Sequence, residues 1–392
     1  MKEVFIVSAA RTPIGAFQGK LKDVPAPRLG ATAIAAAVER AGIAPESIEE
    51  CLMGAVLTAG VGQAPARQAA LFAGLPQAVR ATTVNRVCGS GLKAVMLASQ
   101  MITSNDADTV VAGGMESMSR APFLVPGARD GLRFGHTQLL DSILWDGLTD
   151  AYNEKPMGNC AELCAAERRF SRQEQDRYAT QSYRRALGAI QAGLFKTETA
   201  VVTVPGPKGT STVFDMDEEP ARANLERFAQ LKPAFQKDGT VTAANASSLS
   251  DGAAALVLAS GETVKTRKLN PLARIVAQAS HAQAPEWFTT APVGAVQSLL
   301  KKAGKTAQEI DLFEINEAFS VVALACIKEL GLSEDKVNIR GGAVALGHPI
   351  GASGARILTT LVHALRAEKK RYGIAAICIG GGEASAVLIE AL

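Results

Sequence analysis

The feature that most constrains the fold is a repeat, because one pattern of residues occurs near both ends of the chain. The segments Cys88–Lys93 and Ile350–Arg356 are both rich in glycine and serine, and each opens an apolar helix. A strand-like run follows each helix, Val110–Ala112 in the first copy and Ala375–Ile379 in the second. A duplicated helix–strand unit predicts two similar α/β domains, with loops from both meeting in a cleft.

The first copy lies in a series of alternating helices and strands. We predict a helix over Leu29–Ala41 that ends at Gly42, a strand over Ile48–Val56 and a helix over Ala64–Leu71. A further strand runs to Ala112 and is closed by the pair 113–114, both glycines. Strands that alternate with helices of this length predict a layered α/β sheet.

The middle of the chain has a different texture. Proline and glycine punctuate residues 121–135, and residues 158–193 predict one long, charged helix. A chain of 392 residues is also too long for one compact core. We therefore predict an N-terminal domain over 1–120 that is completed by about 241–268, an inserted loop domain over 121–240, and a C-terminal domain over 269–392.

Composition excludes several classes of protein. The net charge of +3 is too small to indicate a nucleic-acid partner. No run approaches the roughly 18 apolar residues of a membrane span, and Met1–Ser8 predicts a strand rather than a leader, so we expect no membrane partner and a cytoplasmic location. Six scattered cysteines do not suggest a disulfide scaffold. Cys160 and Cys164 stand one helical turn apart without a nearby histidine, so we expect no metal.

Cys88 is the first candidate for chemistry. The strand-like run Thr82–Val84, interpreted as buried, leads into it, and a helix leads out. Gly89 and Gly91 would permit a tight turn there. A helix start offers free N–H groups and a positive dipole, which would lower the pKa of a thiol and make it a nucleophile. The alternative is a small buried core residue, which is what most free cysteines are.

Three further polar residues stand in glycine-rich or strand-end positions. Asn316 could hold a water or orient a carbonyl, or else cap the next helix. His348, between a glycine and a proline, could be a general base or an oxyanion donor, or else a structural loop residue. Cys378 precedes Gly380–Gly382 and could accept a proton beside stabilising N–H groups, or else belong to the core.

Taken together, the motifs resemble the thiolase family over nearly the whole chain, and most closely its biosynthetic acetyl-CoA C-acetyltransferase branch. The combination and its order are specific. The residues that carry the resemblance are Val87–Gly91, Gly113–Ser119, Gly158–Glu162, Thr240–Ser247, Asn316–Phe319, Gly347–Gly351 and Cys378–Gly382.

The resemblance implies a five-layered αβαβα fold with an inserted loop domain, usually as a homotetramer. It implies reversible condensation of two acetyl-CoA molecules to acetoacetyl-CoA and CoA, by a ping-pong mechanism and without a redox cofactor or catalytic metal. Cys88 would carry the acyl group as a thioester, and His348 would activate it and form one oxyanion hole with a water held by Asn316. Cys378 would move the proton of the α-carbon. The N–H groups of Cys88 and Gly380 would form the second hole.

The resemblance also assigns contacts to acyl-CoA. They are Met157, Arg222, Phe235, Ala243, Ser247, Ala318 and Phe319. One branch of the family binds potassium, and the matching positions are Tyr183, Ala243, Ala244, Ala246 and Val344. The chain departs from the family pattern at Arg340, usually asparagine, and at Pro156, often histidine. The usual arginine of the acidic stretch falls on Ala221, one place before Arg222.

Three rival functions remain open. A 3-ketoacyl-CoA thiolase of β-oxidation would use the same residues with a longer acyl pocket. A decarboxylating ketoacyl synthase generally has histidine or asparagine where Cys378 stands. A non-catalytic acyl-CoA-binding protein would not need Cys88, Asn316, His348 and Cys378 together.

Overall fold

One twisted, mixed sheet organises the computed structural model, which describes residues 2–392. Along its main path the strand order is β12-β13-β14-β11-β1-β10-β5-β3-β4, and the short β2 pairs with β10. The strands are β1 (Val4–Arg11), β2 (Gly15–Ala16), β3 (Glu50–Gly54), β4 (Arg80–Val84), β5 (Thr109–Ser117), β10 (Ser250–Ser260), β11 (Ala273–Ala282), β12 (Leu312–Ile315), β13 (Tyr372–Ile379) and β14 (Glu383–Ala391).

The sheet consists of two halves built alike, as the repeat predicts. In the N-terminal half β1, β10 and β5 are antiparallel neighbours, and β3 then runs parallel to β5. In the C-terminal half β11, β14 and β13 are antiparallel neighbours, and β12 then runs parallel to β13. Within residues 2–392 strand pairing joins the halves at one place, where Val4–Ile6 of β1 pairs with residues 273–275 of β11.

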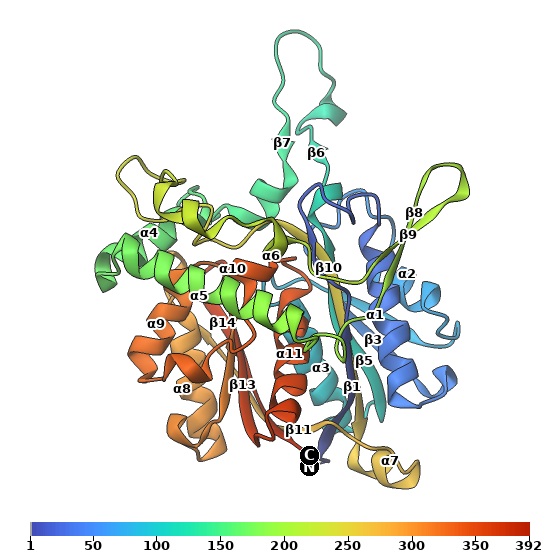
Figure 1. Ribbon diagram of the computed structural model, residues 1–392. Helices are drawn as coiled ribbons and strands as arrows, with labels where there is room; N and C mark the ends of the chain where they lie inside the picture. The colour runs from blue at the N-terminus through green and yellow to red at the C-terminus, as the bar shows by residue number, and fades with distance from the viewer. Residues whose placement is uncertain (1) are drawn as a thin grey trace.

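Helices form three layers around the two halves (Figure 1). Between the halves lie α3 (Ser90–Ser104) and α11 (Ser353–Ala367), and each contacts strands of both. The outer face of the N-terminal half is covered by α1 (Ala26–Ala41) and α2 (Pro65–Phe72). On the other outer face α8 (Ala291–Ala303) and α9 (Ser320–Leu330) cover the C-terminal half, whereas α7 (Gly261–Thr266) contacts β1 and β10 near the lower end of the N-terminal half. The predicted αβαβα layering is confirmed, and one apolar cluster belongs to each helix layer, the central one packing against strands of both halves.

The remaining elements lie outside this layered body (Figure 1). They are the hairpin β6 (Phe123–Leu124) and β7 (Leu140–Asp141), a π-helical segment Ile143–Leu148, α4 (Met157–Arg168), α5 (Arg172–Gln191), the hairpin β8 (Val202–Pro205) and β9 (Ser211–Phe214), α6 (Glu219–Arg222) and α10 (Ala343–Leu346). The single long helix expected over 158–193 is wrong. Arg169 adopts the left-handed conformation that ends α4, and Ser171 with Glu174 forms a capping box that starts α5.

Two strand predictions also need correction. The strand before Cys88 was expected to be buried, but β4 is the edge strand of the sheet and its side chains are partly exposed. The glycine pair at 113–114 does not close a strand either, because β5 continues through it to Ser117. Packing explains the glycine at 114, since a Cβ there would lie 2.1 Å from the carbonyl oxygen of Gly351.

Met1 lies outside the described residues, so the expected first strand is seen from Val4 onward. In residues 2–392 no helix combines the length and apolar character that crossing a membrane requires.

Candidate active site

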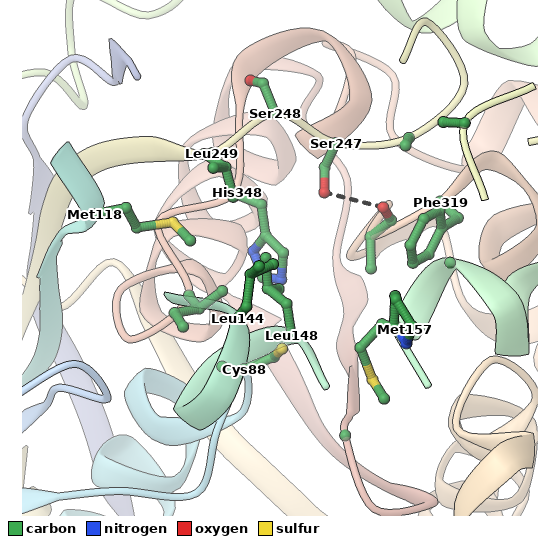
Figure 2. Close-up of a pocket in the computed structure, with 18 of the residues that line it drawn as sticks. Cys88, Met118, Leu144, Leu148, Met157, Ser247, Ser248, Leu249, Phe319 and His348 are labelled. Atoms are coloured by element: carbon green, nitrogen blue, oxygen red, sulfur yellow. Dashed lines mark hydrogen bonds between the residues drawn. The ribbon is translucent and has the colours of Figure 1, made fainter. Parts of the chain in front are cut away.

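A pocket of about 440 Å³ opens where the two halves meet, near the N-terminal ends of α3 and α11 (Figure 2). This size suits a small-molecule site. Most of its wall is apolar, and residues from both halves and from the segment between them contribute. They are Cys88, Met118, Leu144, Gly147, Leu148, Pro156, Met157, Gly158, Glu219, Ala234, Phe235, Ala243, Ala246, Ser247, Ser248, Leu249, Phe288, Ala318, Phe319, His348, Ile350 and Gly380.

Cys88 sits on a strained turn between β4 and α3. Val87, just before it, has φ of 44°, a left-handed conformation that costs a β-branched residue about 1–3 kcal/mol. Hydrogen bonds hold this turn: the Ser90 hydroxyl donates to the Val87 carbonyl at 2.6 Å, and Asn85 Oδ1 accepts from the Val87 N–H at 3.0 Å. The left-handed residue of the turn is therefore Val87, and neither Gly89 nor Gly91 has a positive φ.

The thiol of Cys88 is neutral at physiological pH. Burial raises its pKa to about 11, although the backbone N–H groups of Gly380 and of Cys88 itself act in the opposite direction. The expectation that the helix start alone makes this cysteine a thiolate is therefore wrong, because desolvation outweighs the helix terminus. Cys88 needs a base to become a nucleophile.

His348 is placed to be that base. In Figure 2 the imidazole ring of His348 points into the pocket, in the direction of Cys88. Burial lowers the pKa of His348 to about 3, so the imidazole is neutral. The Ser353 hydroxyl donates to the Pro349 carbonyl at 2.9 Å and so must accept from Nδ1 of His348, 2.6 Å away. Nε2 therefore carries the lone pair, which can take a proton.

Two further predicted residues lie directly behind this wall. Asn316 Nδ2 is 3.5 Å from Nε2 of His348, and its Oδ1 is buried without a protein partner. Cys378, at the end of β13, is also buried, and burial, with Cys88 next in effect, raises the pKa of its thiol well above the usual value. The structure thus brings Cys88, His348, Asn316, Cys378 and Gly380 to one place, although Asn316 and Cys378 do not line the open pocket.

Most of the predicted acyl-CoA contacts line the pocket, and one does not. Met157, Phe235, Ala243, Ser247, Ala318 and Phe319 are all in its wall. Ser247 donates its hydroxyl to the Ala318 carbonyl at 2.9 Å, the dashed line in Figure 2. The Arg222 side chain is instead half exposed, 3.9 Å from Glu219 and outside the wall.

The apolar end of the pocket was missed from the sequence. Leu144 and Leu148 of the π-helical segment lie in front of His348 in Figure 2, and Met118 and Ile350 pack with them beside Cys88. No signal marked the two leucines, because the segment between the repeats has no periodic pattern. Met118 and Ile350 could have been found, since both lie within the motifs themselves.

Arg340, the departure from the family pattern, has a structural place. Its side chain is buried, donates to the Leu194 carbonyl at 3.1 Å and lies 3.7 Å from Glu198. It therefore ties the loop before α10 to the segment after α5. Asn338, two residues earlier, accepts from the Ile315 N–H at 2.8 Å and donates to Glu317 at 2.8 Å.

Comparison with known proteins finds full-length relatives. Residues 4–262 match the thiolase N-terminal domain and residues 269–391 the thiolase C-terminal domain. Acetyl-CoA acetyltransferase 2 of Arabidopsis thaliana is 51% identical over 393 residues, covering 100% of this chain and 98% of that protein. Acetyl-CoA acetyltransferase ERG10, cytosolic, of Gibberella zeae is 50% identical over 99% of this chain and 98% of its own. The crystal structure of Acat5 thiolase from Ascaris suum in complex with coenzyme A superposes with a TM-score of 0.95, at 47% identity and with 100% of both chains covered.

Proposed function

The chain belongs to the thiolase family and is an acyltransferase, and from its pocket we propose how it condenses two acetyl-CoA molecules to acetoacetyl-CoA and CoA. The observation that carries the mechanism is the neutral His348 imidazole, its lone pair on Nε2, in the same apolar wall as the Cys88 thiol and the Gly380 N–H. This arrangement supports covalent catalysis on sulfur.

In the first half-reaction Cys88 is acetylated. Nε2 of His348 takes the thiol proton as the sulfur attacks the thioester carbonyl of acetyl-CoA. The N–H groups of Cys88 and Gly380, which already face the sulfur, support the negative oxygen, and one such donor is worth about 3 kcal/mol. The carbon–sulfur bond to CoA then breaks, and the imidazolium returns its proton to the leaving thiolate.

In the second half-reaction a carbon–carbon bond forms. Nε2 of His348 first takes the proton of the Cys378 thiol, and the Cys378 thiolate then takes a proton from the methyl carbon of a second acetyl-CoA. The resulting enolate oxygen is stabilised by Nε2–H of the protonated His348 and by a water for which the unpaired Oδ1 of Asn316 supplies an acceptor. The enolate carbon attacks the acetyl group, the bond to Cys88 breaks, and the His348 imidazolium gives its proton to the Cys88 sulfur.

Thiolysis rates on 3-ketoacyl-CoA esters of increasing length test this function. Leu144, Leu148, Met118 and Ile350 close the pocket beside Cys88, so we expect kcat/KM to be highest for acetoacetyl-CoA and to fall by about 10-fold or more once the acyl chain must displace a leucine. Equal or higher kcat/KM on long chains would favour the β-oxidation thiolase instead.

We also propose that the protein is a homotetramer. The edge strand β4 leaves backbone groups unpaired, which invites pairing with a second copy. The β6–β7 hairpin projects from the body in Figure 1 and exposes Phe123, Leu132, Phe134 and Leu139. Exposed apolar groups of this kind mark association surfaces. Sedimentation equilibrium, which gives the mass in solution, tests this proposal.

We also propose a potassium site. Tyr183, Ala244 and Val344, from three segments of the chain, belong to one buried cluster, and the donors would be the Tyr183 phenol oxygen and the backbone carbonyls of Ala244 and Val344. Neutral oxygen donors suit a weakly charged alkali cation better than a transition metal. Activity titrated with potassium chloride against sodium chloride tests it. We propose no redox cofactor and no catalytic metal, since the steps above need none.

A cytoplasmic location is likewise a proposal. It is supported by the name of the Gibberella zeae relative, which includes the word cytosolic. Fractionation of the source cells with an antibody to this chain would test it.

A further inference from the structure

Glu116 is a buried acid that the proposed reaction does not use. It lies near the end of β5, is 1% exposed, and has no lysine or arginine within ion-pair distance among residues 2–392. Its carboxylate instead accepts three backbone N–H groups, from Val56 at 3.0 Å, Leu57 at 3.2 Å and Gly351 at 2.9 Å. Burying a carboxylate without a charged partner costs free energy, which indicates that Glu116 has a specific role.

The three donors come from opposite halves of the molecule. Val56 and Leu57 follow β3 in the N-terminal half, which also carries the Cys88 turn. Gly351 belongs to the loop of His348 in the C-terminal half and stands two residues before the start of α11. A single carboxylate therefore connects the half that holds the nucleophile to the loop that holds the base.

The loop is also pressed directly against β5. A Cβ at Gly351 would lie 2.6 Å from Oε2 of Glu116, and a Cβ at Gly114 would lie 2.1 Å from the Gly351 carbonyl. The loop backbone at Gly351 lies directly on the β5 backbone at Gly114, with no side chain between them. The hydrogen bond from Gly351 to Glu116 holds the loop in this position. Ile350, next to it, packs on Val56 and Leu57 in the apolar cluster that reaches Cys88.

The carboxylate cannot be replaced by an amide without loss. Both of its oxygens accept N–H groups, and a glutamine would turn an NH₂ toward one of these donors. Burial raises the pKa of Glu116 to about 7, while the three backbone bonds favour the ionised form.

We propose that Glu116 is a positioning residue that holds the loop Gly347–Gly351, and with it the His348 imidazole, at the distance from Cys88 that proton transfer requires. The inference rests on the proposed roles of His348 and Cys88. Misplacing a reacting group by about 1 Å can cost about 10²-fold in rate. Glu116 itself touches no substrate in this scheme.

The test compares Glu116→Gln with Glu49→Gln. Glu49 also accepts two backbone N–H groups, of Asp108 and Thr109, but at the opposite end of β5 and far along the strand from the pocket. We expect Glu116→Gln to lower kcat for acetoacetyl-CoA thiolysis by about 10–10²-fold, with KM within about threefold. Iodoacetamide alkylation of Cys88 in the free enzyme should slow by a similar factor. Glu49→Gln should leave both unchanged.

A double-mutant cycle separates positioning from general stability. In a His348→Ala background, Glu116→Gln should no longer slow Cys88 alkylation, because its positioning effect passes through the imidazole, while loss of the Glu116 charge, which raises the pKa of Cys88, favours the thiolate. A full further decrease, or wild-type kcat in Glu116→Gln, would overturn the proposal. If Glu116→Gln does not fold, Glu116→Asp, which keeps the charge but shortens the reach, is measured in the same cycle and judged by the same criteria.

The alkylation cycle also distinguishes this inference from the proposed function. It needs no acyl-CoA, so an enzyme that failed to cleave acetoacetyl-CoA would refute the function while the cycle still decided the role of Glu116. Conversely, normal thiolysis with additive effects in the cycle would refute only the role of Glu116.

Discussion

Replacing Cys88 by alanine is expected to lower the thiolysis rate of acetoacetyl-CoA by about 10⁴-fold or more, because the covalent route is lost entirely. The fold should survive the change. Cys88 is only partly exposed and a thiol-to-methyl change removes one atom, which costs about 1 kcal/mol of unfolding free energy. Steady-state rates and thermal unfolding of the same preparation measure the two effects.

Chemical labelling provides the matching observation on the unmodified enzyme. Cys88 is the one partly accessible cysteine in residues 2–392, since Cys51, Cys160, Cys164, Cys326 and Cys378 are buried. Iodoacetamide should therefore modify Cys88 first, and acetylation by acetoacetyl-CoA should protect it. Because burial raises the pKa of this thiol to about 11, labelling of a His348→Ala variant should rise about tenfold per pH unit between pH 7 and 10. Inactivation that followed Cys160 would remove Cys88 from its role.

Replacing Cys378 by alanine is expected to separate the two half-reactions. Condensation should fall by about 10³-fold, because the α-proton loses its acceptor, whereas Cys88 should still be acetylated. Rapid-quench mass spectrometry of the enzyme mixed with acetyl-CoA measures the acetyl-enzyme, and acetoacetyl-CoA formation measures the second step.

Cys51→Ala is the matched control for that experiment. Cys51 is also a fully buried strand cysteine, in β3, and it lies outside the pocket wall. Both variants should lose similar unfolding free energy, and only Cys378→Ala should lose condensation. A Cys378→Ala enzyme that could not be acetylated would place this residue in the first half-reaction instead.

The sequence alone was enough to identify the four polar and thiol side chains that meet at or directly behind the pocket. Cys88, Asn316, His348 and Cys378 stand at strand ends or helix starts, and the duplication predicts that such positions from both halves converge. The structure has them together, with the layers in the expected order. Each motif contains both a reactive side chain and the residues that place it at a strand end or a helix start. The sequence pattern therefore predicts the type of the side chain and its position together.

Contacts between the halves could not be predicted in the same way. The glycine at 114 reads locally as the end of a strand, yet it is there because Gly351, more than two hundred residues later, approaches it. The ionisation of Cys88 was also misjudged, since the helix start is visible in the sequence and the burial that outweighs it is not. Val87 gives no hint of its left-handed conformation, because a β-branched residue normally avoids it.

The close approach of the two halves limits where the substrate range of such an enzyme can change. Where Gly54, Gly91, Gly114 and Gly351 meet, even a methyl group would force backbones apart, so the packing of the two halves beside Cys88 and Ile350 admits no larger residue. Leu144 and Leu148 of the π-helical segment Ile143–Leu148 line the pocket from a part of the chain that lies outside the main sheet. Substitutions that admit bulkier acyl groups, in nature or in laboratory selection, should therefore accumulate in this segment and leave the catalytic residues unchanged.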